Sequence, residues 1–517
     1  MEGKGYVYLV GAGPGDEGLI TVKGKECIEE GDVVVYDYLI NRRLLDYAKP
    51  GAEKIYVGKR GGSTNSSHQE HINRILNDKA SEGKKVVRLK GGDPTVFGRG
   101  GEEALFLAKR GIPFEIVPGV SSVSAVPAYA GIPISHREFA SCFIVATGHE
   151  FSEDGEHGEK LPWESLAGIP TIVFLMGFRN VGRIMEKLIQ HGKDPSTPAA
   201  LVSWGTIPRQ RTVTGTVGDI AERVTERDMK PPSIVIVGEV VNLRGYMNWY
   251  EERPLFGKRI VVTRAREQAA PLVKSIERQG GEAIEFPVIA IAEPDSWEEL
   301  DDAIGSLEEF DWIVFTSVNG VERFFRRLHQ SGRDSRALHA IKTAAIGEQT
   351  ARALERKGFN ADVVPGDYIA EGLIREFRDL DIKGKRIVIP RAAEAREVLP
   401  EKLVEMGAIV RVVPAYKTIT PLGGHVEDIV EEIKEMLSRG MIDAVTFTSS
   451  STVRNFMELI AEPGLMTGVT LACIGPITAH TLTGLGFEPD IVCEKHTVHA
   501  LVNELSNYYS HNPQKDK

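Results

Sequence analysis

The chain has 517 residues, of which 42% are hydrophobic and 26% charged, and its formal net charge is -11. A chain of this length is too long for one hydrophobic core, so two to four domains are expected. The negative charge argues against generic affinity for nucleic acid, but local Arg and Lys side chains can still bind a small anionic molecule.

Signals for membranes, disulfides and metals are missing from the sequence. The chain contains no apolar run of about 18 residues, and Met1–Val10 lacks the charged-then-apolar pattern of a signal peptide. We therefore expect a cytoplasmic protein with no membrane segment. The histidines show no HExxH or paired spacing, which predicts no metal site. The four cysteines form no CxxC motif and are expected to be buried, reduced thiols. They are Cys27, Cys142, Cys473 and Cys493.

The first predicted strand, Tyr6–Val10, leads directly into the turn GAGPGD at Gly11–Asp16. This turn differs from the dinucleotide-binding fingerprint, because its glycines are not spaced as GxGxxG. In addition, Pro14 and Asp16 occupy the positions where a helix N-terminus would hold pyrophosphate. A Rossmann cofactor site is disfavoured, whereas a tight turn against which a nucleoside lies remains open.

A helix over Thr21–Glu30 and a buried strand over Asp32–Tyr36 follow, and the strand ends at Asp37. A carboxylate just past the carboxyl end of a central strand lies where α/β sheets bind ligands. A solvated strand end or a helix cap is the commoner role for such a residue. The local pattern leaves both interpretations open.

The stretch Val86–Glu103 is the most informative part of the chain. It begins as a β-branched strand and then places five glycines around Asp93. Bare backbone at the carboxyl end of a strand lets a ligand approach without meeting a Cβ atom. An ordinary βα turn is the alternative, but five glycines with no visible packing gain favour a binding loop. The glycines are Gly91, Gly92, Gly98, Gly100 and Gly101.

Further strands continue the α/β pattern to about residue 250. Ile116–Pro118 is a predicted strand, and Ser121 and Ser122 stand where they would cap the small-residue helix Ser124–Ala130. The region therefore reads as two successive α/β lobes with a ligand site between them. The later predicted strands are Thr171–Met176, Ala199–Ser203 and Ser233–Val237, and Glu150–Lys160 is expected to form an exposed loop.

Three motifs together resemble the tetrapyrrole methylases: GAGPGD, VGKR at Val57–Arg60, and KGGDPTVFGRGGEE within the glycine-rich stretch. Within that family, residues 5 to 250 are most similar to uroporphyrinogen-III C-methyltransferase. The resemblance implies a two-lobed methylase domain over residues 1–250, S-adenosyl-L-methionine as the cofactor, and a homodimer formed through this half.

The same resemblance assigns roles to individual residues. It implies that Asp37 is a proton acceptor and Lys59 a proton donor. It also implies a set of cofactor contacts in the loops that follow the strands. These are Pro14, Gly91, Gly92, Asp93, Val96, Ser121, Ser122, Met176 and Gly205.

The second half begins after the polar connector Asn248–Pro254 and repeats itself at a spacing of roughly 130 residues. Such a repeat is too long for a solenoid and indicates two similar lobes. Each repeat alternates β-branched strands with amphipathic segments, the pattern of a parallel sheet flanked by helices. The matching pairs are GKRIVVTRA with GKRIVIPRA, FDWIVFTS with IDAVTFTS, and AAIGEQTARAL with ACIGPITAHTL.

Strand ends in this half carry hydroxyl and arginine side chains, which suit a ligand with several carboxylates. Capping of the following helices explains the hydroxyls equally well. The residues predicted to bind substrate are Arg264, Thr316, Ser317, Arg391, Ser449 and Thr478.

The VxTR, FTS and IGxxTA patterns resemble uroporphyrinogen-III synthase over residues 255–507, which leaves 508–517 as a polar tail. This resemblance implies that Tyr416 assists catalysis and that Thr478 lines the cleft. A synthase and a methylase would perform consecutive steps. The chain is thus expected to close hydroxymethylbilane to uroporphyrinogen III and then methylate it twice, giving precorrin-2 for siroheme or cobalamin.

Three alternatives remain open. The first half would instead methylate a later corrin intermediate, or it would modify RNA, as a related fold does. The second half would be a non-catalytic, bilobed module that only binds tetrapyrrole. Isomer analysis of the product separates this last case from a synthase.

Overall fold

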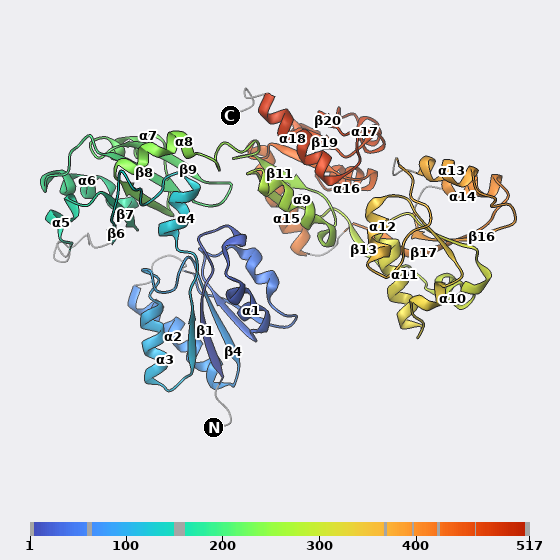
Figure 1. The fold of residues 1–517 in the computed structure, drawn as a ribbon, viewed down its shortest axis with the longest axis horizontal. Helices are drawn as coiled ribbons and strands as arrows, with labels where there is room; N and C mark the ends of the chain where they lie inside the picture. Colours follow the sequence, from blue (N-terminus) through green and yellow to red (C-terminus); the bar gives the residue numbers. More distant parts are fainter. Residues whose placement is uncertain are drawn as a thin grey trace. The chain divides into compact units, whose positions relative to one another are not determined.

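The computed structural model describes residues 5–58, 65–148, 161–366, 370–394, 398–420, 424–460 and 462–511. The chain divides into two compact units. The methylase-like unit comprises Met1–Lys258 with Gln279–Glu282, and the synthase-like unit comprises Arg259–Arg278 with Ala283–Lys517. Each unit contains two sheets (Figure 1). Lys59 and the predicted loop Glu150–Lys160 lie outside the described residues.

The first sheet of the methylase-like unit is parallel throughout, in the order β3-β2-β4-β1-β5. Its central strands are buried on both faces, which is why they read as continuous runs of Val and Leu. Val33 and Val35 pack into one core, and Val34 packs into the other. The strands are β1 (Tyr6–Gly11), β2 (Val33–Tyr36), β3 (Glu53–Tyr56), β4 (Lys85–Lys90) and β5 (Phe114–Val117).

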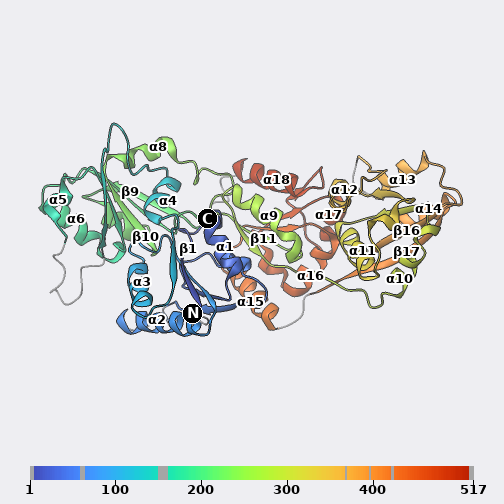
Figure 2. The same ribbon diagram turned by 60° about the horizontal axis from the view of Figure 1, so that its bottom comes forward.

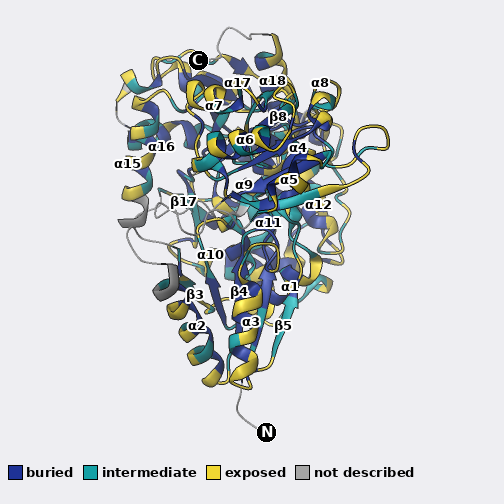
Figure 3. Ribbon diagram, turned by 90° about the vertical axis from the view of Figure 1, so that its left-hand side faces the viewer, coloured by how far each residue is buried: buried dark blue, intermediate teal, exposed yellow. Residues whose placement is uncertain are grey.

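Helices cover both faces of this sheet. α2 (Asn65–Ser81) and α3 (Gly100–Lys109) pack on one face, and α1 (Val22–Glu30) packs on the other (Figure 1). Figure 3 shows β4 in the colour of buried residues and exposed positions along α2. The parallel arrangement brings the loops that follow β1, β2, β4 and β5 to one edge of the sheet.

The second sheet of this unit is mixed, in the order β6-β7-β10-β8-β9. Only β6 and β7 run parallel, whereas β10 is antiparallel to β7 and β8, and β9 is antiparallel to β8. The strands are β6 (Phe143–Thr147), β7 (Thr171–Leu175), β8 (Pro198–Ser203), β9 (Arg211–Thr216) and β10 (Ser233–Val237). The helices are α4 (Ser122–Tyr129), α5 (Trp163–Ala167), α6 (Val181–Gln190), α7 (Ile220–Glu226) and α8 (Arg244–Met247).

One lobe of the synthase-like unit, here called the split lobe, is assembled from residues 259–278, 283–289 and 424–511. Its sheet has the order β12-β11-β18-β19-β20. The strands are β11 (Arg259–Val262), β12 (Glu282–Glu285), β18 (Ala444–Phe447), β19 (Thr470–Cys473) and β20 (Ile491–Val492). The helices are α9 (Arg266–Arg278), α15 (Gly424–Ser438), α16 (Ser450–Ile460), α17 (Pro476–Thr483) and α18 (Val498–His511).

The other lobe, here called the inserted lobe, spans residues 290–420, and its sheet has the order β13-β17-β16-β14-β15. α10, α11 and α12 pack on one face of the sheet and α13 and α14 on the other (Figure 2). The strands are β13 (Ala290–Ala292), β14 (Trp312–Phe315), β15 (Lys342–Ala345), β16 (Arg386–Ala392) and β17 (Ile409–Ile419). The helices are α10 (Glu298–Gly305), α11 (Val318–Gln330), α12 (Glu348–Glu355), α13 (Ala370–Arg378) and α14 (Val398–Glu405).

The sequence repeats do not coincide with the two lobes. β11 begins the first repeat but pairs with β18 of the second, and β16 begins the second repeat but pairs with β14 of the first. Four strands of each sheet follow one order, because each lobe takes two leading strands from one repeat and the next two from the other, while β20 and β13 are added at opposite edges. The prediction of two α/β lobes is confirmed, although each lobe is built from parts of both repeats.

Three of the cysteines are buried, as expected, but the prediction is wrong for Cys142, which is exposed. None of the helices in the described ranges has the length and apolarity needed to cross a bilayer. Within those ranges, no group of three or more His, Cys, Asp or Glu side chains is arranged to hold a metal ion.

Candidate active sites

Three loops meet at the carboxyl edge of the first sheet with their backbones in direct contact. Gly13 and Gly92 exchange two backbone hydrogen bonds, with N···O distances of 3.2 and 2.7 Å. A Cβ atom on Gly11 would lie 2.5 Å from Cα of Gly119, and one on Gly119 would lie 2.4 Å from the carbonyl oxygen of Gly92. Only glycine tolerates such contacts. The loops after β1, β4 and β5 therefore form one backbone platform.

The other glycines of the glycine-rich loop are packed as well. A Cβ atom on Gly91 would lie 2.9 Å from a neighbouring side chain, and Cβ atoms on Gly98 and Gly100 would lie 2.8 and 2.4 Å from the carbonyl oxygen of Pro94. An added Cβ on Gly101 would meet nothing within 4 Å. The sequence suggested no packing reason for these glycines. That interpretation was wrong for Gly91, Gly98 and Gly100, because the loop folds tightly on itself, whereas an added Cβ on Gly92 would meet nothing closer than 3.8 Å.

Asp93 holds the glycine-rich loop in place. Its Oδ1 accepts hydrogen bonds from the amide and hydroxyl of Thr95, at 2.7 and 2.6 Å. Its Oδ2 accepts one from the amide of Gly119 at 3.1 Å. Burial alone would raise the pKa of Asp93, but these hydrogen bonds outweigh burial and lower the pKa below its usual value. A cofactor role for Asp93 is thus expected to act through loop geometry.

Left-handed backbone at non-glycine residues is concentrated in the loops predicted to bind ligand. Phe97, Met176 and Trp204 have φ angles of 52°, 54° and 50°. Arg99 and Thr206, in the same loops, are also left-handed. Such conformations store strain and cluster at functional sites. Met176, predicted to contact the cofactor, has half of its surface exposed, and Val96 is exposed as well.

The turn that contains Pro14 is attached to the second lobe of the methylase-like unit through Asp16. The amide of Asp16 donates to Oγ1 of Thr206 at 3.1 Å, and its Oδ2 accepts a hydrogen bond of 2.7 Å from the hydroxyl of Tyr129. Gly205 precedes Thr206 and packs on α4, where an added Cβ would lie 2.3 Å from Cγ1 of Val126. The predicted contacts Pro14 and Gly205 thus belong to connected segments of the two lobes.

Ser121 and Ser122 lie where the loop after β5 becomes α4. The hydroxyl of Ser121 accepts a hydrogen bond from the amide of Val123 at 3.3 Å, so Ser121 is the N-cap of the helix. Ser122 begins the helix beside Gly92, because a Cβ atom on that glycine would lie 3.8 Å from the Ser122 nitrogen. Ser121 therefore has the predicted capping role, and Ser122 lies beside the glycine-rich loop.

Asp37 follows β2 and belongs to a chain of buried charges. Its Oδ2 lies 3.1 Å from Nη2 of Arg88, and Nε of Arg88 lies 3.4 Å from Oε1 of Glu103. The same Glu103 oxygen lies 2.9 Å from Nζ of Lys90. Arg88, Lys90 and Glu103 are almost fully buried, and burial is the main cause that lowers the pKa of Lys90. This cluster was not predicted from the sequence, although Arg88 and Lys90 interrupt an apolar strand.

The Asp37 carboxylate is oriented at both oxygens. Oδ1 accepts a hydrogen bond from the amide of Leu39 at 3.1 Å, while Oδ2 pairs with Arg88. The side chain still retains 24% of its exposure, so it can meet a ligand at the sheet edge. Lys59, the predicted proton donor, lies outside the described residues.

In the inserted lobe, the predicted residues Ser317 and Tyr416 are in contact. Ser317 follows Thr316 at the end of β14 and caps α11 by accepting a hydrogen bond from the amide of Gly320 at 3.0 Å. Its hydroxyl lies 2.9 Å from the hydroxyl of Tyr416. Burial raises the pKa of Tyr416, against the lowering effect of hydrogen bonds with Ser317 and Asn319. The phenol is therefore protonated at neutral pH and able to donate.

Another polar contact, between Gln268 and Asn319, joins the split lobe to the inserted lobe. Nε2 of Gln268 in α9 donates to Oδ1 of Asn319 in α11 at 2.7 Å. Nε of the predicted residue Arg264 donates to Oε1 of Gln268 at 3.2 Å. Burial lowers the pKa of Arg264. The sequence analysis missed Gln268 and Asn319, although Asn319 stands just after the FTS motif at a helix start.

The remaining predicted substrate residues lie at separate places. Ser449 accepts a hydrogen bond from the amide of Thr452 at 3.2 Å and caps α16 in the split lobe. Thr478 is buried within α17 of the same lobe. Arg391 is buried at the end of β16 in the inserted lobe, where its neighbour Ala392 is opposite Tyr416. The described contacts thus connect Arg264, through Gln268 and Asn319, with the helix that Ser317 caps.

Comparison with known proteins assigns the two halves. The family model described as tetrapyrrole (corrin/porphyrin) methylases matches residues 6–221, and the model for uroporphyrinogen-III synthase HemD matches residues 270–503. "Porphyrin biosynthesis protein HemD" from Ruminiclostridium josui is 38% identical over 509 residues, which cover 97% of each chain. The chain belongs to this family of methylase–synthase fusions.

Other relatives match a smaller share of the chain. "Uroporphyrinogen-III C-methyltransferase" from Methanocaldococcus jannaschii is 53% identical over 46% of this chain and 98% of its own length. A protein of the same name from Bacillus subtilis is 43% identical over 70% of this chain and 74% of its own length. A crystal structure of uroporphyrin III C-methyl transferase from Thermus thermophilus is 42% identical, with a TM-score of 0.40, over 46% of this chain and all of that one.

Proposed function

We propose that the fusion catalyses two consecutive steps. Its second half would close hydroxymethylbilane to uroporphyrinogen III, with inversion of ring D and loss of water. Its first half would then transfer two methyl groups to uroporphyrinogen III and form precorrin-2. The observation that carries this proposal is the match of one chain, along 97% of its length, to a porphyrin-biosynthesis protein.

The cofactor proposed for the first half is S-adenosyl-L-methionine. The platform of glycine backbone can accept a nucleoside at Gly92, where an added Cβ atom would meet nothing closer than 3.8 Å, so this part of the main chain is open. Val96 and Met176 offer exposed apolar surface for the uncharged parts of the ligand. When bound, the cofactor supplies an electrophilic methyl group. The protein's main contribution to transfer is alignment of that group with the macrocycle carbon.

Asp37 is the proposed base. Transfer of a methyl cation to a substituted pyrrole carbon leaves the macrocycle positively charged, so a proton must leave from another position of the ring system, and we propose that a carboxylate at the sheet edge accepts it. The contacts with Leu39 and Arg88 hold both oxygens in fixed directions while part of the side chain stays exposed. Lys59 remains the proposed proton donor.

Tyr416 and Ser317 are the proposed acid and its partner in the synthase half. Loss of water from hydroxymethylbilane requires a proton on the departing hydroxyl group. Tyr416 is the group proposed to supply that proton, because its phenol is neutral and Ser317, 2.9 Å away, orients the hydroxyl. The other proposed substrate contacts are Arg264, Thr316, Arg391, Ser449 and Thr478.

Two incubations of the intact protein test the halves separately. Hydroxymethylbilane without the cofactor should give the type III isomer, and uroporphyrinogen III with S-adenosyl-L-methionine should give a product two methyl groups heavier. A type I isomer from the first incubation would mean that the second half only binds tetrapyrrole. Failure of the second incubation would direct attention to a later corrin intermediate or to RNA as the methyl acceptor.

The proposal also covers the oligomeric state of the protein and its location in the cell. A homodimer formed through the methylase half is expected to give twice the chain mass in light scattering. The cytoplasm is the proposed location, and cell fractionation tests it. A monomer would contradict the first of these proposals.

A further inference from the structure

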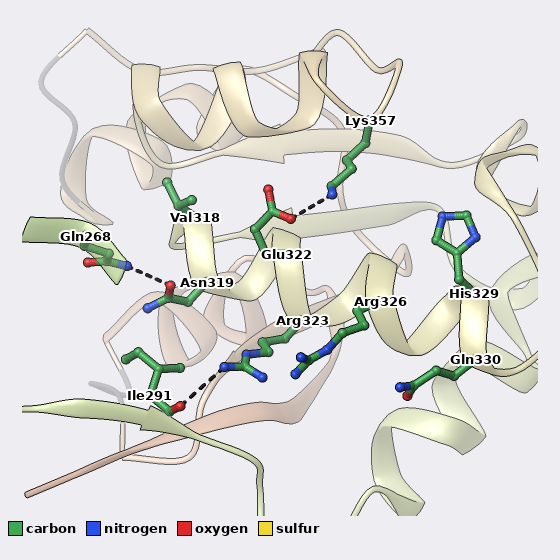
Figure 4. Close-up of a pocket in the computed structure, with 10 residues that line it drawn as sticks. All are labelled: Gln268, Ile291, Val318, Asn319, Glu322, Arg323, Arg326, His329, Gln330 and Lys357. Atoms are coloured by element: carbon green, nitrogen blue, oxygen red, sulfur yellow. Dashed lines mark hydrogen bonds and ion pairs between the residues drawn. The ribbon is translucent and has the colours of Figure 1, made fainter. Parts of the chain in front are cut away.

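The synthase-like unit contains a cavity of about 780 Å³ that none of the predicted site residues lines. Figure 4 shows its wall, which is formed mainly by one side of α11. Gln268 of α9 and Ile291 of β13 complete two of its edges. Polar and charged side chains in the wall include Asn319, Glu322, Arg323, Arg326, His329 and Lys357.

The cavity side of α11 is not needed for packing. The opposite side of the helix carries Val321, Phe324, Phe325 and Leu328, which are buried in the core of the inserted lobe. The residues that line the cavity follow helical spacing along the other side. The side chains on this side of the helix, Arg323 and Arg326 among them, are therefore available to bind a ligand.

The cations of the cavity are only partly neutralised by the wall. Lys357 pairs with Glu322 at 2.7 Å. Arg323 donates to the main-chain carbonyl of Ile291 at 3.3 Å, which is an uncharged acceptor. Arg326 lies 3.8 Å from Glu293, and both side chains are about half exposed, so this pair is weak. The lining therefore has an excess of positive charge.

The cavity adjoins the proposed synthase site through Asn319, which also hydrogen-bonds with Tyr416. Asn319 lines it and accepts the hydrogen bond from Gln268. Ser317 stands two residues earlier in the chain and contacts Tyr416. A long ligand whose reacting end lies at Tyr416 can thus extend along α11 towards Arg323 and Arg326.

We propose that this cavity is a carboxylate-binding subsite that holds acetate and propionate groups of the linear tetrapyrrole, with Arg323 and Arg326 as the principal contacts. Guanidinium groups suit carboxylates because they offer paired N–H donors in one plane. This inference rests on the proposed synthase function. It adds that binding of the substrate arms is located on α11, away from the groups that perform the reaction.

Steady-state kinetics of the intact protein with hydroxymethylbilane test the subsite. Arg323→Gln should raise KM about tenfold, the effect of losing one charge-assisted hydrogen bond, with kcat little changed. Arg326→Gln should raise KM less and Arg326→Glu more, because reversal adds repulsion to the loss of attraction. Arg336→Gln is the matched control, since Arg336 lies in the same lobe, is 92% exposed and pairs with Asp334. This control should leave KM unchanged.

The outcomes separate the subsite from the synthase function itself. A wild-type protein that yields only the type I isomer would overturn the synthase function. A type III product with the same KM in the wild type and in all three variants of Arg323 and Arg326 would overturn the subsite alone. Arg326 is half exposed, so its two variants remain folded and decide the question even if Arg323→Gln is unstable. A fall in kcat with unchanged KM would also contradict the proposal.

Discussion

Asp37 differs from an ordinary strand-end carboxylate because of the buried charges behind it. Arg88 contacts both Asp37 and Glu103, and Lys90 contacts Glu103. Removing one member of a buried ion cluster leaves another charge without compensation, which is costly. The cluster therefore fixes the position of Asp37 from inside the sheet, while one side of the carboxylate stays accessible.

Asp37→Asn separates chemistry from binding. The amide keeps the size of the side chain and much of its hydrogen bonding but cannot act as a base. S-adenosyl-L-methionine should still bind, measured by calorimetry, while methyl transfer slows by a factor on the order of a hundred to ten thousand. The synthase reaction of the same sample is the internal control. Near-normal methylation would remove Asp37 from the chemistry and leave Lys59 or a bound water as the base.

Asp93→Ala tests whether loop geometry controls cofactor binding. Loss of the hydrogen bonds from Thr95 and Gly119 should cost about 1–2 kcal/mol of stability and weaken cofactor affinity. Asp194→Ala is the control, because Asp194 accepts the same pair of hydrogen bonds from Ser196, in the turn before β8. Its cofactor affinity should match the wild type. Equal affinities in all three proteins would exclude the loop from the site.

The lowered pKa of Asp93 adds a pH dependence to this prediction. A carboxyl group whose pKa is lower in the folded state stabilises the protein fully above its unfolded pKa, near 3.9. That stabilisation is lost as the pH falls through the folded pKa. The stability difference between the wild type and Asp93→Ala should therefore shrink below about pH 4, as seen in denaturant titrations.

At the scale of elements, the methylase-like site is a junction of three strand ends. The loops after β1, β4 and β5 approach so closely that their glycines exclude one another's side chains. The platform thus depends on all three loops together. A substitution in one loop should therefore displace the backbone of the other two.

Gly119→Ala should disrupt this junction, because its Cβ atom would lie 2.4 Å from a backbone oxygen. We expect a loss of about 2 kcal/mol or more in chemical denaturation and weaker cofactor binding. Gly101→Ala is the matched control, since its Cβ atom meets nothing within 4 Å and the residue lies in the first turn of α3. It should be neutral or slightly stabilising. Similar losses in both variants would contradict the packing argument.

Helices and strands could be predicted from the sequence because the residue patterns that specify them are local. Val33–Tyr36 and Ser233–Val237 are apolar strands between polar turns, and the structure places them within one residue of the prediction. The exchange of leading strands between the two repeats could not be predicted, because strands of similar sequence fit either sheet. Nor could the Gln268–Asn319 contact, because it depends on how two lobes approach.

At the scale of the whole molecule, the fusion places two reactions on one chain. Each unit has its own cores and its own sheets. The proposed boundaries, 1–250 for the methylase and 255–507 for the synthase, meet at the connector that ends in Pro254. Such a connector suits two domains that fold independently.

Separation of the chain at Arg253–Pro254 should give two active fragments. The first should methylate uroporphyrinogen III, and the second should form the type III isomer, each with a rate close to that of the intact protein. Circular dichroism reports whether both are folded. Insoluble or inactive fragments beside an active intact chain would show that the boundary is misplaced.

The central claim is that one chain both makes and methylates uroporphyrinogen III. The most direct measurement supplies the intact protein with hydroxymethylbilane and methyl-labelled S-adenosyl-L-methionine in a single sample and analyses the product by mass and isomer. We predict a type III macrocycle that carries two labelled methyl groups. A type I macrocycle, or a type III macrocycle without label, would contradict the claim.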